Sequence, residues 1–344
     1  MKCHACCLTL ALSLIVPAGS VWAVPVLWGT DEDTGHLIKV ESYDSSPIVT
    51  DYGRLSVDDD GVVRPFPDTY LEADDVYSDI ESFTLDNQGV AFMVGNSPLE
   101  FVDGGAYSAP RLYSLRIFKP DGTEAVSVDD ANATGGYNAL QSVGEITGIA
   151  SGSVINGIDF DPLTQLLFGA VENSGRDDLI VIDPTTAVAT TIAFSMDGTD
   201  DVEDIQFDFG GKLFLIDDDG GASETDDVLH EVVLDRSGTL PALSSISVVN
   251  NTGGDSRIEA LGWDFKNDRL IAFSDSFNSI FELSHTTNGY SDLGSVGFND
   301  IEGIDFVPTR TGLPVVPEPS TLSLIGLGLC AFSVGRARVR GQRA

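Results

Sequence analysis

The architecture of this chain is predicted from one heptapeptide near its C-terminal end, Ile301-Glu302-Gly303-Ile304-Asp305-Phe306-Val307. Earlier segments share its pattern, which is an acidic or amide residue in second place and then apolar residues two or three positions apart. These segments are 80–86, 155–161, 202–208 and 258–264. After the middle three copies come two further apolar or β-branched runs, separated by turns rich in Gly, Asp and Asn, as expected of strands. Repetition at roughly 40 to 75 residues favours a β-propeller, whose blades repeat at about 40 to 50 residues.

The last copy has no companion strands after it, because the C-terminal tail follows directly. At the other end of the body, segments 26–29 and 36–41 resemble second and third strands that lack a first. We therefore predict an all-β fold, a β-propeller of about five blades with six or seven as alternatives, in which 301–307 completes the N-terminal blade. Such closure removes free sheet edges. An array of β-sandwiches is the competing architecture.

Composition limits the classes of function. The chain has 344 residues, with 54 acidic against 18 basic residues and a formal net charge of −36, which excludes binding to nucleic acid through its phosphates. Its 42% of apolar residues supports a packed core. All the cysteines lie near the two ends, so a disulfide scaffold is excluded. The sequence contains no Gly-x-Ser-x-Gly, phosphate-loop or His-Glu-x-x-His motif.

Residues 1–23 have the pattern of a secretory signal peptide. Lys2 precedes an apolar run over 8–16, and small residues follow, with cleavage expected after Ala23. The run is too short to cross a bilayer, which needs about 20 residues. The mature body is therefore predicted to span 24–313.

Residues 314–344 form a tail of three parts. The first contains Val316, Pro317, Glu318, Pro319 and Ser320. An apolar stretch over 321–335, expected to form a short hydrophobic helix, leads to a basic tail over 336–344 with four arginines. Because cationic flanks stay on the cytoplasmic side of a membrane, the body would face outward.

This tail resembles the PEP-CTERM sorting signal of certain Gram-negative bacteria, through its motif at 317–320, its apolar helix and its arginine cluster. The resemblance implies that an exosortase recognises and processes the chain. It also implies transient anchoring in the inner membrane by the tail, as a short transmembrane helix, and delivery to the cell surface or extracellular matrix. An exopolysaccharide or a surface protein would then be the partner.

The second residue of each repeated segment is the candidate metal ligand. These residues are Glu81, Asn156, Glu203, Glu259 and Glu302. The innermost strands of a propeller border its channel, so we expect a ring at one mouth. Converging carboxylates repel one another unless they bind a cation, and hard oxygen ligands suit Ca²⁺ better than Zn²⁺. The ring resembles the Glu-Gly inner-strand element of calcium-dependent phytase-like and esterase-like propellers, although solvated residues at strand starts would give the same pattern.

From these features we expect an exported, non-catalytic, Ca²⁺-dependent binding propeller. One alternative is a Ca²⁺-dependent phytase-like or esterase-like hydrolase, in which the glutamates of the ring hold a metal that polarises a phosphate or ester. A structural matrix protein without a discrete ligand is the other. The many runs of Asp, such as 58–60 and 217–219, are expected to cap turns or to hold Ca²⁺ in loops.

Overall fold

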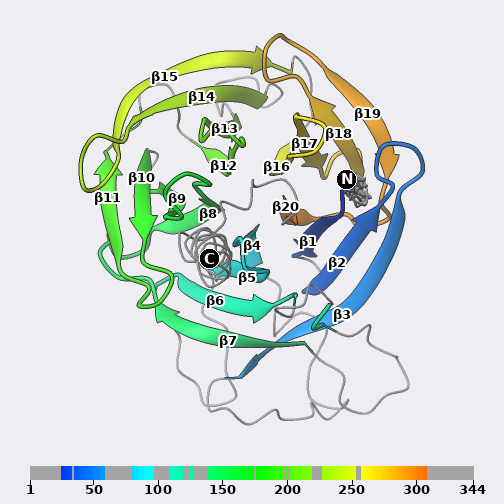
Figure 1. Cartoon of the computed structure of the whole chain (residues 1–344), viewed down its shortest axis with the longest axis horizontal. Helices are drawn as coiled ribbons and strands as arrows, with labels where there is room; N and C mark the ends of the chain where they lie inside the picture. Colours follow the sequence, from blue (N-terminus) through cyan, green and yellow to red (C-terminus); the bar gives the residue numbers. More distant parts are fainter. Residues whose placement is uncertain are drawn as a thin grey trace, which may run out of the picture. The chain divides into compact units, whose positions relative to one another are not determined.

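The computed structural model describes residues 25–32, 35–58, 80–96, 109–118, 124–126, 138–173, 176–194, 196, 199, 201–218, 227–252 and 257–307. The secondary structure of this part is entirely β, with four-stranded units arranged around a central axis (Figure 1). The predicted signal peptide, the sorting tail and the apolar helix at 321–335 lie outside the described residues. Within the described part, no helix is long and apolar enough to cross a membrane.

Each blade is a meander of four antiparallel strands, from an inner strand at the axis to an outer one at the rim. Blade 1 contains β20 (Ile301–Phe306), β1 (Leu27–Asp31), β2 (His36–Glu41) and β3 (Ile48–Asp58). Blade 2 contains β4 (Ile80–Leu85), β5 (Val90–Gly95), β6 (Arg111–Arg116) and β7 (Asn138–Glu145). Blade 3 contains β8 (Val154–Phe160), β9 (Leu167–Glu172), β10 (Asp177–Ile182) and β11 (Ala189–Ala193). Blade 4 contains β12 (Val202–Phe207), β13 (Leu213–Asp218), β14 (Asp227–Asp235) and β15 (Ala242–Asn251). Blade 5 contains β16 (Ile258–Asp264), β17 (Arg269–Ser274), β18 (Ser279–Leu283) and β19 (Tyr290–Ser295).

The predicted closure between the two ends of the body is confirmed. Strand β20 pairs antiparallel with β1, with Leu27 opposite Phe306 and Gly29 opposite Ile304. The last strand of the chain is thus the inner strand of the first blade, and the described residues form the five-bladed propeller that the repeats predict.

One strand pairing was not predicted. The outer strands β3 and β7 pair in parallel, with Leu55 opposite Asn138, so blades 1 and 2 form one eight-stranded sheet. Elsewhere along the described rim, β11, β15 and β19 are each the last strand of their sheet.

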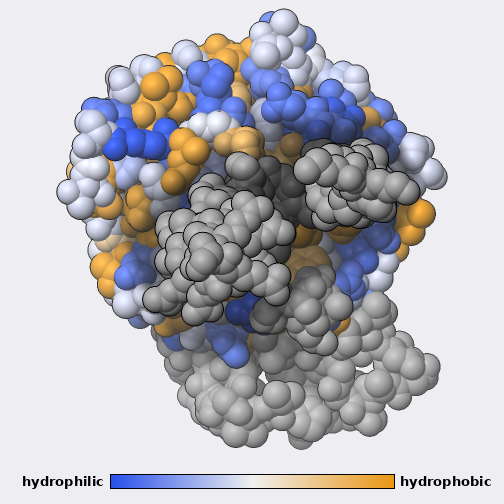
Figure 2. All heavy atoms as spheres, viewed as in Figure 1, coloured by the Kyte–Doolittle hydropathy of each residue, from blue (hydrophilic) through white to orange (hydrophobic). Residues whose placement is uncertain are grey.

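The hydrophobic core is divided into clusters that lie between neighbouring blades. Trp28 of blade 1 packs with Phe83 of blade 2, for example, and Phe168 of blade 3 packs with Phe207 of blade 4. This arrangement follows from the strands, because alternate residues point to opposite faces of each blade. On the outer surface, apolar residues are scattered among hydrophilic ones (Figure 2).

Candidate metal site at the mouth of the central channel

Each of the five residues predicted to form the ring lies at a β-bulge near the start of an inner strand. In β4, Ile80 pairs with Gly95 and Ser82 with Val94, so that Glu81 is the extra residue. The same skip occurs at the other four positions, Asn156, Glu203, Glu259 and Glu302. A bulge twists the strand and redirects the side chain of its extra residue. The repeated pattern in the sequence therefore marks one structural feature that occurs in every blade.

The four glutamates of the ring influence one another electrostatically. Burial, followed by the charge of Glu259, raises the pKa of Glu203 to about 10 and the pKa of Glu302 to about 12. The charge of Glu81 contributes to both of these increases. Burial and the charges of nearby aspartates raise the pKa of Glu259 to about 8. Burial and the neighbouring charges together thus make ionised carboxylates costly at this end of the inner strands.

Two blades add further carboxylates to their ring residue. In blade 1, Glu302 lies beside Glu32 and Asp300, and one oxygen of each lies within 4.8 Å of the others. In blade 4, the same spacing holds for the carboxylates of Asp201, Glu203 and Asp218. We call these the blade 1 and blade 4 triads.

The two triads are built from equivalent positions. In each, an aspartate two residues before the bulge faces an acidic residue at the end of the second strand. The same backbone hydrogen bond closes both, with Glu32 N donating to Asp300 O at 2.7 Å and Asp218 N donating to Asp201 O at 2.9 Å. The sequence pattern did not predict that these four carboxylates join the ring residues, although Asp218 lies in the run at 217–219 that is expected to cap turns or to hold Ca²⁺. The sequence signal that could have indicated these groups is the Asp-x-Glu spacing, which occurs at 201 and 203 and again at 300 and 302.

Blade 5 provides an internal comparison. Its equivalent backbone bond runs from Asp275 N to Arg257 O at 3.3 Å, so Arg257 takes the position of the first aspartate of a triad. The Arg257 guanidinium lies 4.0 Å from a carboxylate oxygen of Asp275. Where blades 1 and 4 place a third carboxylate, blade 5 therefore places a cation.

Farther along the inner strands, buried aspartates join neighbouring blades. Asp159 accepts a hydrogen bond of 2.6 Å from Phe207 N, and Asp204 accepts one of 2.7 Å from Leu261 N. Asp305 likewise accepts a bond of 2.7 Å from Leu85 N. Burial raises the pKa of all three aspartates, that of Asp305 to about 7. These groups already accept backbone hydrogen bonds, so they are structural links between blades.

At the other end of the inner strands, aspartates cap the hairpins. Asp86 accepts bonds of 2.8 Å from Gln88 N and Val90 N, and Asp208 accepts one of 2.7 Å from Lys212 N. Asp264 caps its turn in the same way. These single aspartates cap turns, whereas the described residues of the two runs named from the sequence, Asp58, Asp217 and Asp218, lie in strands β3 and β13.

The sorting tail is identified by comparison with protein families. The model of the PEP-CTERM protein-sorting motif matches residues 315–339. This chain carries a PEP-CTERM sorting motif. The motif includes the Val316 to Ser320 segment on which the resemblance rests. A PEP-CTERM motif implies export, a membrane-anchored sorting signal and processing by an exosortase.

Other comparisons describe the body. No curated protein matches the chain in sequence. Among solved structures, similar ones include a putative 6-phosphogluconolactonase from Bacteroides uniformis, with 10% identity, coverage of 82% of this chain and 99% of that one, and a TM-score of 0.44. A putative gluconolactonase has 12% identity, coverage of 82% and 81%, and a TM-score of 0.43. A chain of a nidogen/laminin complex has 11% identity, coverage of 82% and 98%, and the same TM-score of 0.43.

Proposed function

We propose that this PEP-CTERM protein is an exported, non-catalytic binding propeller whose channel mouth depends on Ca²⁺. The observation that carries the proposal is the pair of equivalent triads in blades 1 and 4, set against the arginine that occupies the same position in blade 5. A bound cation in each triad would supply the positive charge that Arg257 supplies in its blade.

The donor atoms of the triads fit calcium. All are carboxylate oxygens, and each triad places them within 4.8 Å of one another. Ca²⁺ takes six to eight oxygen ligands at about 2.3 to 2.6 Å, completed by water or backbone carbonyls, whereas Zn²⁺ prefers His and Cys. Calcium sites of extracellular modules have dissociation constants of about 0.1 to 1 mM, a range matched to an exported protein.

Calcium binding would also be linked to the protonation of the mouth. Without a cation, the raised pKa values of Glu203, Glu259 and Glu302 leave these groups protonated near neutral pH. An ion in a triad would displace those protons and hold the bulged start of the inner strand to the end of the second strand of the same blade. We propose that the protein binds an exopolysaccharide or a surface protein through the loops above the mouth. The bound ion would hold in place the strand ends that carry these loops.

The test is a thermal melt of the full chain in 10 mM CaCl₂ and in EGTA. A ligand present at about 10 to 100 times its dissociation constant stabilises the folded state by roughly 1.4 to 2.7 kcal/mol per site. We expect a higher melting temperature in calcium, with most of the increase lost in the double variant Glu203→Gln, Glu302→Gln. Equal melting of the wild-type protein in both buffers would refute the proposal.

Glu172→Gln is the matched control variant. Glu172 ends the second strand of blade 3, the position of Asp218 in blade 4, but its blade has Val154 and Asn156 in place of the other two carboxylates. This variant should keep the full calcium response. Screening phosphoesters and lactones with the wild-type protein and Glu203→Gln tests the hydrolase alternative, which requires turnover that the variant loses.

A further inference from the structure

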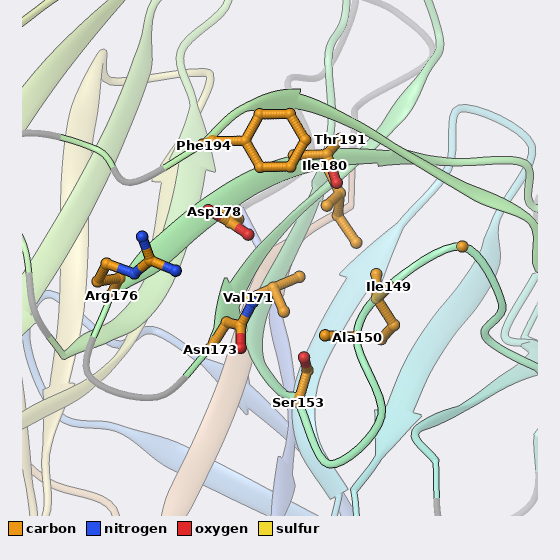
Figure 3. Close-up of a pocket in the computed structure, with 11 residues that line it drawn as sticks. Ile149, Ala150, Ser153, Val171, Asn173, Arg176, Asp178, Ile180, Thr191 and Phe194 are labelled. Carbon is orange, nitrogen blue, oxygen red and sulfur yellow. The ribbon is translucent and has the colours of Figure 1, made fainter.

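A cavity lies in blade 3, and no triad residue lines it. It is a cavity of about 350 Å³ bounded by the loop before β8, the end of β9, and strands β10 and β11 (Figure 3). Its volume lies within the usual range of about 300 to 1,000 Å³ for small-ligand sites in proteins.

The walls of this cavity are fixed by the backbone. Thr147 N donates to Ala187 O at 3.1 Å and Ala189 N donates to Thr147 O at 2.7 Å, which ties the loop to the start of β11. Gly148 makes this close approach possible, because a Cβ there would lie 2.2 Å from Ala189 O and its φ is +93°. The opposite wall is held by Asn173 N, which donates to Arg176 O at 2.8 Å. The site is therefore formed before any ligand arrives.

The lining combines apolar and polar side chains. Figure 3 shows Ile149 and Ala150 on one side, facing Asn173, Arg176 and Asp178 across the cavity. These three polar groups are planar and offer both donors and acceptors. At the bottom, the Ser153 hydroxyl is buried and has no hydrogen-bond partner among the described residues.

An aromatic ring stands at the edge of the cavity. Phe194 is 76% exposed, the largest exposed fraction among the large apolar side chains of the described residues. It follows directly after β11 and borders the polar groups (Figure 3). An exposed phenylalanine beside a cavity offers a flat apolar face on which a ligand can stack.

We infer that this cavity binds a neutral sugar ring of a polysaccharide, with the ring stacked on Phe194 and its hydroxyls bonded to Asn173, Arg176, Asp178 and Ser153. A pyranose has apolar C–H faces and a hydroxyl-bearing edge. Phe194 would contact a C–H face, and the polar groups of the lining would bond the hydroxyls. A neutral ring is favoured over an acidic one because Asp178 adjoins Arg176 in the lining and the chain has a net charge of −36. The inference rests on the proposed function only in taking the body as a binding domain, since no triad residue lines the cavity.

The test is isothermal titration of the full chain with maltohexaose, cellohexaose and mannohexaose as neutral probes and with trigalacturonate as an acidic one. We expect binding of at least one neutral probe, weakened at least tenfold in Phe194→Ala. Phe209→Ala is the matched control, since Phe209 is 49% exposed on a turn of blade 4. This control should bind within twofold of the wild-type protein, and the wild-type protein should bind within twofold in EGTA.

Each other result has a definite meaning. No binding of any neutral probe, binding of trigalacturonate alone, or neutral binding that Phe194→Ala leaves unchanged would overturn the inference. If calcium still raises the melting temperature in that case, the proposed function stands. If sugar binds as expected but calcium has no effect on the melting temperature, the calcium sites fail and the sugar site stands.

Discussion

Replacing Gly303 by alanine should strain the contact between the inner strands of blades 1 and 2. Gly303 follows the bulge in β20, and its backbone lies against the inner strand of blade 2. A Cβ at this position would lie 2.2 Å from Phe83 N and 2.7 Å from Phe83 Cβ. Both contacts are with atoms at or next to the backbone, so no flexible side chain can move aside.

The magnitude follows from this geometry. Ordinary contacts between such atoms are about 3.5 to 4 Å, so the two inner strands must separate by more than about 1 Å. Overpacking a well-packed core costs about 1 to 3 kcal/mol, and backbone contact places Gly303→Ala near the upper figure. At about 2 to 4 °C per kcal/mol, the melting temperature should fall by roughly 6 to 12 °C.

Gly262→Ala is the matched control. It is also an inner-strand glycine, but a Cβ there would meet Ile304 and Leu27 at an ordinary 3.4 Å. Its unfolding free energy should change by less than about 1 kcal/mol. Urea unfolding measures both variants, and calcium titration should also show weaker binding in Gly303→Ala, because Glu302 precedes the altered residue. Equal stability of the two variants would refute the argument that the inner strands of blades 1 and 2 pack too closely to admit a Cβ at position 303.

Two further predictions concern charge at the mouth. In EGTA, the unfolding free energy should fall as pH rises from about 5 to 9. The pKa values of Glu203 and Glu259 in the folded state, about 10 and about 8, exceed the value of 4.5 for an unfolded glutamate. The folded state therefore holds more protons than the unfolded state over this range, and rising pH destabilises it. Saturating calcium should flatten this dependence, and urea unfolding across the pH range measures it; stability in EGTA that rises with pH would contradict it. Arg257→Asp should create a third triad with Glu259 and Asp275, so the melting-temperature difference between calcium and EGTA should increase, with Arg257→Ala as the control. An unchanged difference would show that the triad geometry does not bind the ion.

The repeated segment shows how much of the fold can be predicted from local sequence patterns. The bulge in each inner strand appears in the sequence as an acidic or amide residue between apolar ones, because a strand with one extra residue needs apolar side chains on both sides of it. The missing first strand at the N-terminus and the surplus one at 301–307 likewise reveal closure, since a blade lacking its inner strand would expose an edge. The composition of the tail likewise predicted the sorting motif, whose order of parts is local.

The remaining features depend on pairing between distant segments. Glu32 joins Asp300 only because β1 pairs with β20, and the parallel contact of β3 with β7 has no signal in either strand. The cavity in blade 3 depends on a loop held against β11 by Gly148. By itself, the sequence predicted the three inner strands of each blade, the closure and the export motif, because these follow from the order of neighbouring residues; that the repeated acidic or amide residue lies at a β-bulge is seen only in the strand register. Only the tertiary structure decided which carboxylates meet and where a cavity remains. Both depend on distances between strands, which the order of residues along the chain does not specify.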